Sequence, residues 1–322
     1  MGGESHYLTQ LYRAANSFPA KGFLSGLFAC YAINKASSLL SHCVLNNWHP
    51  AEPWNSQQEL VLITGGSSGI GQTIAEELSE REVKVVIIDI QEPEFTHSPN
   101  IYFYEADVTS TDSIKAAADK IRAKHGHPTV LVNNAGVFTN DTILDEPESM
   151  IWKSFKVNTL AHFLTVKEFL PSMVRHNHGH VVTMASMASF ITVGEMVDYA
   201  CTKASALAFH EGLSQEIRHW YGATRVRTSI VNPLWVRTPL IRNLTDAGDS
   251  FGQPIMDTRM VSAAVVKHIL ERKSGSIILP ASSSVATFIR SLPSWLQEWL
   301  RNSFSLKVMR VRNEFWSREP SL

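Results

Sequence analysis

Seven short runs of β-branched and other apolar residues recur along the chain beyond residue 58, and segments of helical length separate them. Within each run the apolar residues are nearly continuous, which is typical of strands covered on both faces of a sheet. The alternation of strand and helix predicts an α/β fold with a doubly wound parallel sheet of about seven strands. The expected strands are residues 59–64, 83–89, 101–105, 129–133, 180–184, 226–231 and 276–279. The expected helices include residues 71–81, 110–124, 147–174 and 199–220.

The composition suits one large domain with extensions. Of the 322 residues, 44% are hydrophobic and 18% are charged, so the chain can bury a sizeable core. The formal net charge of −1 argues against a nucleic-acid partner, which normally requires a basic face on the protein. Three scattered cysteines are too few for a disulfide framework, which favours a reducing compartment. The alternating histidines at 176, 178 and 180 have no acidic neighbour in the sequence, so we expect a solvated loop and no metal.

The first expected strand runs directly into the glycine-rich turn GGSSGIG at residues 65–71, and a helix follows the turn. Glycines permit a tight turn and let the backbone approach a pyrophosphate, which binds at the amino end of the helix. A glycine-rich loop alone is a weak signal, but the strand before it and the helix after it supply the required context. The turn therefore predicts nucleotide binding.

Asp89 ends the second expected strand, 18 residues beyond Gly71. A carboxylate at this place can accept hydrogen bonds from the adenosine ribose and would repel a 2′-phosphate. No Arg or Lys lies in the glycine turn, so NAD(H) is favoured over NADP(H), which stays the alternative. Asp107 follows the third strand, where a carboxylate could meet the adenine amino group, and the small-residue turn at 133–136 follows the fourth.

Tyr199 and Lys203 are four residues apart, which places both side chains on one face of a helix. A phenol with a pKa near 10 is a poor base at neutral pH, and a neighbouring ammonium stabilises its phenolate. This spacing is common on ordinary helices. Ser186, at the end of an expected strand 13 residues upstream, favours a catalytic interpretation, in which Ser186 holds a substrate oxygen while Tyr199 moves a proton.

Taken together, these motifs resemble the short-chain dehydrogenase/reductase family in its compact single-domain, Rossmann-type branch. The matching pieces cover residues 59 to 280 in the family's order. They are TGGSSGIG at 64–71, Asp107, NNAG at 133–136, Asn158, Ser186, Tyr199 with Lys203, and Asn232-Pro233. The N-terminal apolar segment and the stretch at 208–217 look most like membrane-associated retinol and 17-beta-hydroxysteroid dehydrogenases within that family.

The resemblance implies a role for each matching position. Tyr199 would be the general acid/base, Ser186 would position the reacting oxygen, and Lys203 would lower the tyrosine pKa and bind the nicotinamide ribose. Asn158 would order a proton-relaying water, and Thr238 would bind the nicotinamide carboxamide. The expected cofactor-binding residues are Gly65, Ser67, Ser68, Gly69, Ile70, Gly71, Asp89, Asp107, Val108, Asn134, Ala135, Gly136, Tyr199, Lys203, Pro233, Val236 and Thr238.

Two departures from the family pattern affect the expected pocket. Leu234 and Trp235 follow Pro233 where the family usually has glycine, and Ser189 stands where glycine is common. The two bulky residues either narrow the nicotinamide end of the pocket or re-route the loop. Residues 239–262 are expected to be irregular and to close over substrate, with Met187, Phe190 and Met196 shaping specificity. Trp152 and Phe155 are expected in the core.

Both ends of the chain suggest contact with lipid. Residues 18–45 hold only two charges, and their apolar runs at 22–33 and 36–45 are each too short to span a bilayer alone. This segment is expected either to lie in a membrane or to pack on the domain behind it. Residues 289–300 carry a helical apolar stripe with two tryptophans, and the 22 residues from Arg301 have a net charge of +3. That pattern is typical of a membrane-surface helix; a dimer interface or a flap over the substrate mouth are the alternatives.

The sequence thus predicts four segments: an anchor at 1–45, a linker at 46–58, a catalytic domain at 59–285 and a basic tail at 286–322. We expect a nicotinamide-dependent oxidoreductase that interconverts a lipophilic alcohol and its carbonyl, such as a retinoid, steroid or polyketide-like molecule. Its location would be the surface of the endoplasmic reticulum or a lipid droplet, facing the cytosol, with homodimerisation an open question. The alternatives are a non-redox cofactor-binding scaffold at a lipid surface and an epimerase or dehydratase on the same fold.

Overall fold

The computed structural model describes residues 18–94, 98–246 and 251–315. The chain divides into two compact units, Met1–His49 and Pro50–Leu322. In the smaller unit the two expected apolar runs form one continuous helix, α2 (Phe18–Leu45). No helix in the described part of the chain is both long and apolar enough to cross a membrane.

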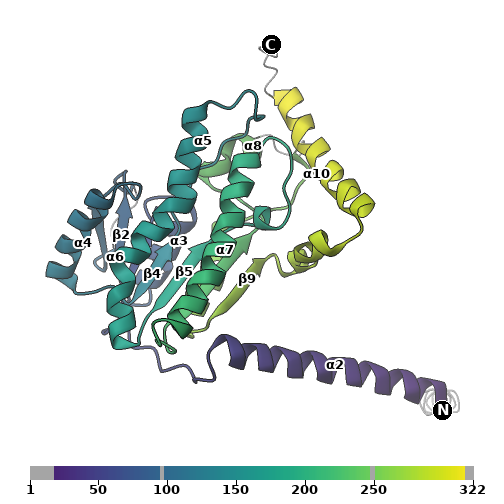
Figure 1. Cartoon of the computed structure of the whole chain (residues 1–322), viewed down its shortest axis with the longest axis horizontal. Coiled ribbons are helices and arrows are strands. Elements are labelled where there is room, and N and C mark those ends of the chain that lie inside the picture. Colours follow the sequence, from purple (N-terminus) through teal and green to yellow (C-terminus); the bar gives the residue numbers. More distant parts are fainter. Residues whose placement is uncertain (1–17, 95–97, 247–250, 316–322) are drawn as a thin grey trace, which may run out of the picture. The chain divides into compact units, whose positions relative to one another are not determined.

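A parallel sheet of seven strands forms the centre of the larger unit (Figure 1). In spatial order its strands are β3 (Ile101–Glu105), β2 (Lys84–Asp89), β1 (Leu60–Thr64), β4 (Val130–Asn133), β5 (His180–Met184), β6 (Arg227–Pro233) and β9 (Gly275–Leu279). The strand order reverses direction between β1 and β4, and this switch point opens a crevice at the carboxyl ends of the strands. The predicted doubly wound sheet is confirmed.

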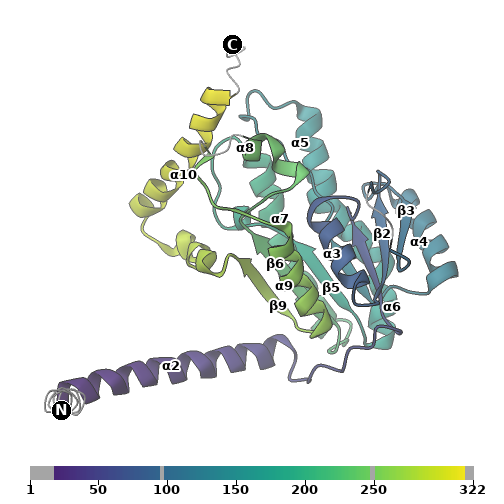
Figure 2. The same cartoon turned by 180° about the vertical axis from the view of Figure 1, so that it is seen from behind.

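Helices cover both faces of the sheet, as Figures 1 and 2 show from opposite sides. Alternate residues of β1 point to opposite faces, so Val61 and Ile63 pack in one core cluster while Leu60 and Leu62 pack in the other. Both layers exclude water, which explains the continuous apolar runs in the sequence. The first face is covered by α3 (Gly69–Ser79) and α9 (Thr258–Leu270), and the second by α4 (Thr111–His125), α6 (Ala161–His176) and α7 (Val197–His219).

The expected single helix at 147–174 is interrupted. It comprises α5 (Glu148–Phe155), a π-helical turn η1 (Lys156–Leu160) and then α6. The turn displaces the register of the helix and buries Asn158 completely. π-Helical turns of this kind are frequent at functional sites. Trp152, expected in the core, is 59% exposed because it lies on the outer side of α5.

The chain between β6 and β9 is more ordered than we expected for residues 239–262. It contains β7 (Trp235–Val236), η3 (Pro239–Ile241), α8 (Arg242–Asp246) and β8 (Ile255–Met256) before α9 begins. The short strands β7 and β8 pair in parallel. This pairing holds Trp235 next to Phe251, with their ring centroids 5.0 Å apart.

The carboxyl-terminal region consists of a 3-10 helix, η5 (Ala281–Ser291), followed by α10 (Ser294–Phe315). The expected stripe from 289 to 300 is therefore not one helix, because Ile289 belongs to η5 and Leu292 and Pro293 separate the two helices. Ile289 is buried, whereas Trp295 and Trp299 are 72% and 62% exposed. Of this expected stripe, the tryptophans of α10 are exposed to solvent, whereas Ile289 of η5 is not.

The histidine interpretation also needs correction. His180 is buried in β5, where its Nε2 lies 2.9 Å from the Ser229 hydroxyl. His178 pairs with Glu59, whose Oε1 is 3.2 Å from its Nε2. Glu59 lies 119 residues before His178 in the sequence, directly before β1, so the local sequence around the histidines could not indicate this acidic partner. Among the described residues no cluster of three metal-ligating side chains was found.

Candidate active site

The glycine turn brings backbone close to backbone at the switch point. Gly65 has a φ of +65°, and a Cβ there would lie 2.7 Å from the Ala135 Cα. A Cβ at Gly71 would lie 2.3 Å from the Gly65 carbonyl oxygen and 2.5 Å from the side-chain Nδ2 of Asn134. Both positions therefore require glycine on steric grounds. The turn leads into the amino end of α3, where free N–H groups can bind a phosphate.

Two side chains from neighbouring strand ends hold this turn in place. The Asn134 Nδ2 donates hydrogen bonds to the carbonyl oxygens of Thr64, at 3.1 Å, and Gly65, at 2.8 Å. The Asp89 Oδ2 accepts a hydrogen bond of 3.0 Å from the Ser67 backbone N–H. The carboxylate at the end of β2 is thus fixed beside the turn.

One cavity of about 850 Å³ runs along the carboxyl ends of the strands. It brings together most of the residues that the sequence predicted. Those on its wall are Gly65, Ser68, Gly69, Ile70, Asp89, Asp107, Val108, Asn134, Ala135, Gly136, Ser186, Tyr199, Lys203, Pro233, Val236 and Thr238. Ser67, Gly71 and Asn158 do not line it. Gly71 instead packs within the turn, and the Ser67 hydroxyl donates to the Gln91 carbonyl oxygen at 2.6 Å.

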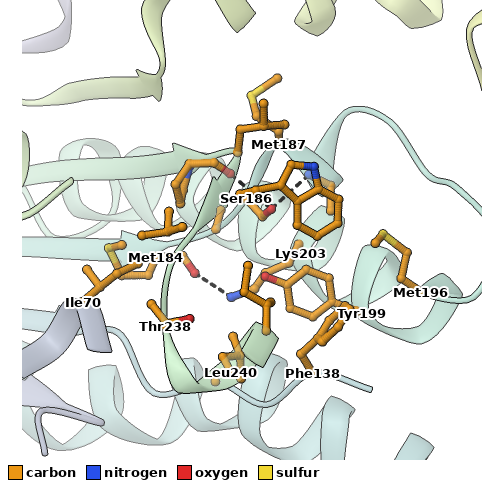
Figure 3. Close-up of a pocket in the computed structure, with 18 of the residues that line it drawn as sticks. Ile70, Phe138, Met184, Ser186, Met187, Met196, Tyr199, Lys203, Thr238 and Leu240 are labelled. Atoms are coloured by element: carbon orange, nitrogen blue, oxygen red, sulfur yellow. Dashed lines mark hydrogen bonds between the residues drawn. The ribbon is translucent and has the colours of Figure 1, made fainter. Parts of the chain in front are cut away.

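Tyr199, Lys203 and Ser186 lie together on the cavity wall (Figure 3). The first turns of α7 position Tyr199 and Lys203, and the Lys203 Nζ is 5.5 Å from the centre of the Tyr199 ring. Lys203 donates a hydrogen bond of 2.9 Å to the Met184 carbonyl oxygen at the end of β5. Phe138 packs edge-on against the Tyr199 ring at 5.0 Å. The phenol is thereby held in one orientation.

Burial sets the protonation of this group. It raises the pKa of Tyr199 to about 12, against the lowering influence of the neighbouring Ser186 hydroxyl, so the lowered pKa that we expected from Lys203 is not found in this structure. Burial also lowers the pKa of Lys203 to about 8, because a charged ammonium is poorly solvated there. Tyr199 therefore carries its proton at neutral pH in this structure and can donate it.

Asn158 does not line the cavity but forms hydrogen bonds with residues behind the cavity wall. Its Oδ1 accepts from the Val137 backbone N–H at 2.8 Å, and its Nδ2 donates to the Val137 carbonyl oxygen at 2.9 Å. The same Nδ2 donates to the Thr202 hydroxyl at 3.1 Å. Asn158 thus joins the loop after β4 to the helix that carries Tyr199 and Lys203.

Sequence reasoning missed much of the cavity's outer part. Phe138, Ile191 and Val193 line it, whereas Phe190 does not. Leu234 and Trp235 line it as well, and Trp235 also pairs with Ile255 between β7 and β8. From the carboxyl-terminal region, Leu292, Leu300, Phe304, Lys307 and Val308 complete the wall. Their position on the cavity wall agrees with one alternative that the sequence left open for this stripe, a flap over the substrate mouth.

The residues present fit a bound nicotinamide dinucleotide. A Cβ at Gly65 would clash with Ala135, so the turn stays open beside the cavity, and Asp89, which is bonded to the Ser67 N–H of the turn, lines that cavity together with Asp107. Thr238 lies over the turn, with its side chain 3.4 Å from where a Gly69 Cβ would be. When bound, such a cofactor supplies or accepts a hydride.

The topology, the phosphate-binding turn and the Tyr–Lys pair together define a nicotinamide-dependent oxidoreductase acting on CH–OH groups. The chain belongs to the short-chain dehydrogenase family, whose model matches residues 59–249. It is 43% identical over 201 residues to the dehydrogenase RED2 of Cochliobolus heterostrophus, covering 62% of this chain and 76% of the relative. Human estradiol 17-beta-dehydrogenase 11 is 32% identical over 262 residues, covering 79% and 85%.

Solved structures share the fold. Levodione reductase superposes with a TM-score of 0.62 at 20% identity, covering 71% of this chain and 98% of that one. A 3-ketoacyl-(acyl-carrier-protein) reductase from Brucella melitensis, complexed with NADH, superposes with a TM-score of 0.61 at 19% identity, covering 70% and 98%. The predicted family and reaction class are confirmed.

Proposed function

We propose that this enzyme interconverts a lipophilic alcohol and its ketone or aldehyde, with Tyr199 as general acid/base. The observation that carries the proposal is the juxtaposition of Tyr199, Lys203 and Ser186 on the wall of a cavity whose outer part is apolar. Phe138, Met187, Met196 and Trp235 surround the reacting end. A steroid-type relative is consistent with a substrate of that character.

In the reducing direction the Tyr199 phenol donates its proton to the substrate oxygen, which the Ser186 hydroxyl orients. The Lys203 ammonium stabilises the phenolate that remains, since a positive charge favours the deprotonated tyrosine. Asn158 keeps the helix that carries both groups in register with the loop after β4. Oxidation of the alcohol reverses these proton movements.

We propose NAD(H) as the preferred cofactor. The Asp89 carboxylate lies beside the glycine turn, where it can bond the ribose hydroxyls and would repel a 2′-phosphate. No Arg or Lys occurs within residues 64–71 to bind such a phosphate.

We also propose that the enzyme works at a membrane surface. Trp295, Trp299, Leu306 and Met309 are exposed and recur at helical spacing along α10. The 22 residues from Arg301 carry a net charge of +3, which favours an anionic lipid surface. All three cysteines are free thiols, as suits a domain on the cytosolic side.

A homodimer is proposed on separate grounds. Trp152, Leu160 and Phe163 are 59%, 52% and 48% exposed on α5, η1 and α6. Three large apolar side chains on one stretch of helix are typical of a subunit interface.

The test of the catalytic proposal is turnover of purified protein in detergent, with NAD(H) and NADP(H), against retinoid, steroid and aliphatic alcohols and ketones. Tyr199→Phe should lower kcat by about 10²- to 10⁴-fold, the usual contribution of a general acid/base, while cofactor binding persists. Tyr221→Phe, in an exposed tyrosine bonded to Glu216, is the matched control. Full turnover by Tyr199→Phe would refute the mechanism. Cofactor binding by the wild type without turnover of any substrate would favour the alternative of a non-redox cofactor-binding scaffold.

A further inference from the structure

The outer part of the cavity is closed by α10. Leu300, Phe304 and Val308 line it at intervals of four residues, so they occupy one face of the helix. Val308 packs in a buried cluster with Val193 and Met196, against which Tyr199 also packs. The reacting end and the α10 end are therefore parts of one chamber.

Several polar side chains interrupt the apolar lining of the cavity, and Lys307 and Gln253 are two of them. Lys307 of α10 is exposed but lines the cavity, and its ammonium has no ion pair or hydrogen bond to the described residues. By contrast, Arg301 and Arg312 on the same helix are both paired with carboxylates. Gln253, which precedes β8, also lines the cavity, and its Nε2 is buried with no hydrogen-bond partner in the described structure.

These donors belong to segments that pack on each other. Val311, one helical turn beyond Lys307, is fully buried in a cluster with Phe251, which lies two residues before Gln253. The face of α10 that carries Lys307 is thus the face against which the Gln253 segment lies. Asp145 and Glu195, the carboxylates of the facing loops, are paired with Arg312 and not with Lys307.

We propose that Lys307 and Gln253 bind a carboxylate at the end of the substrate remote from the reacting carbon. Neither the Lys307 ammonium nor the Gln253 amide N–H has an acceptor among the described protein groups, and one carboxylate can accept from both. The substrate class is then a lipophilic hydroxy or oxo acid, with its apolar body in the chamber between this end and Tyr199. This assignment rests on the proposed function of the same cavity.

The experiment compares a lipophilic hydroxy acid with its methyl ester, using long-chain and steroid examples, in NAD⁺-dependent oxidation by the full-length protein. The wild type should show a lower KM for the acid. Lys307→Met should raise the KM of the acid about fivefold with kcat little changed, and should leave the KM of the ester within about twofold. Lys307→Arg should restore most of the loss, and Gln253→Leu should raise the KM of the acid in the same direction.

Arg310→Met, in an exposed arginine that does not line the cavity, is the matched control and should change neither KM. An equal KM for acid and ester in the wild type, or an equal effect of Lys307→Met on both, would overturn the carboxylate site. The proposed function would survive either result, because the ester would still be oxidised. Absence of turnover with every acid, ester and neutral alcohol would instead count against the proposed function.

Discussion

Arg312 near the end of α10 pairs with Asp145 in the loop before α5, with 3.0 Å between Nη2 and Oδ2. Its other nitrogen, Nη1, lies 3.4 Å from the Glu195 Oε1. These contacts join segments 167 and 117 residues apart in the sequence. The Arg312 guanidinium thus links α10 to the loop before α5 and to the loop before α7.

Replacing Arg312 should weaken the packing of α10 over the cavity. We expect Arg312→Gln to raise KM about threefold to tenfold with a smaller effect on kcat, because the wall formed by α10 becomes less populated in its closed position. The change should also speed proteolytic cleavage within residues 292–315. Arg81→Gln removes an ion pair with Glu77 on α3, far along the chain, and serves as control. Unchanged KM and cleavage would show that the ion pairs of Arg312 do not hold α10 against the domain.

Cofactor choice should depend on the charge of Asp89. Asp89→Asn keeps the size of the side chain and removes its negative charge, so the preference for NAD(H) over NADP(H) should fall about tenfold, or ~1.4 kcal/mol. The ratio of kcat/KM for the two cofactors measures this. Glu105→Gln, at the end of the neighbouring strand β3, should leave the ratio unchanged. A ratio that stays constant in Asp89→Asn would contradict the NAD preference.

The glycine turn should not tolerate a methyl group at Gly71. Because that Cβ would meet the Gly65 carbonyl oxygen at 2.3 Å, Gly71→Ala should cost about 2–4 kcal/mol of unfolding free energy and weaken cofactor binding. Gly212→Ala is the opposite case, since nothing lies within 4 Å of its Cβ on α7. That change should stabilise the protein by up to ~1 kcal/mol. Denaturant titration distinguishes the two.

Acid should unfold the protein partly through His162. Burial lowers its pKa to about 3, and neither ring nitrogen has a partner in the described residues. Below the unfolded value of about 6.5 the unfolded chain binds a proton that the native state does not, so stability falls as the pH falls. Relative to the wild type, His162→Leu should gain up to about 3 kcal/mol between pH 6.5 and 4, with a constant difference above pH 7.5. A pH-independent difference would refute this origin of acid sensitivity.

Binding to lipid should depend on the exposed tryptophans of α10. The double variant Trp295→Ala, Trp299→Ala should reduce partitioning onto anionic phospholipid vesicles about tenfold or more, because each indole loses interfacial contact. Trp220→Ala, in a tryptophan that is 76% exposed at the end of α7, is the control. Vesicle flotation of the full-length protein measures the effect. Unchanged flotation would remove this stripe from the membrane proposal.

The catalytic end of the cavity was predictable because its signals are local. A strand that leads into glycines, and a tyrosine four residues before a lysine, are properties of short segments whose backbone geometry follows from the residues themselves. The strands at 101–105 and 180–184 agree with the structure to the residue, whereas the strand expected at 226–231 spans Arg227–Pro233.

What the sequence by itself determined is therefore the sheet, the turn and the placing of Tyr199 and Lys203 on one helix. Only the tertiary structure decided that Lys203 donates to Met184, that His178 meets Glu59 and that α10 closes the chamber. These contacts join residues far apart in the chain. An apolar stripe such as that of α10 indicates that one face of the helix is buried, but it does not indicate which part of the molecule covers that face. The packing of the whole domain decides this.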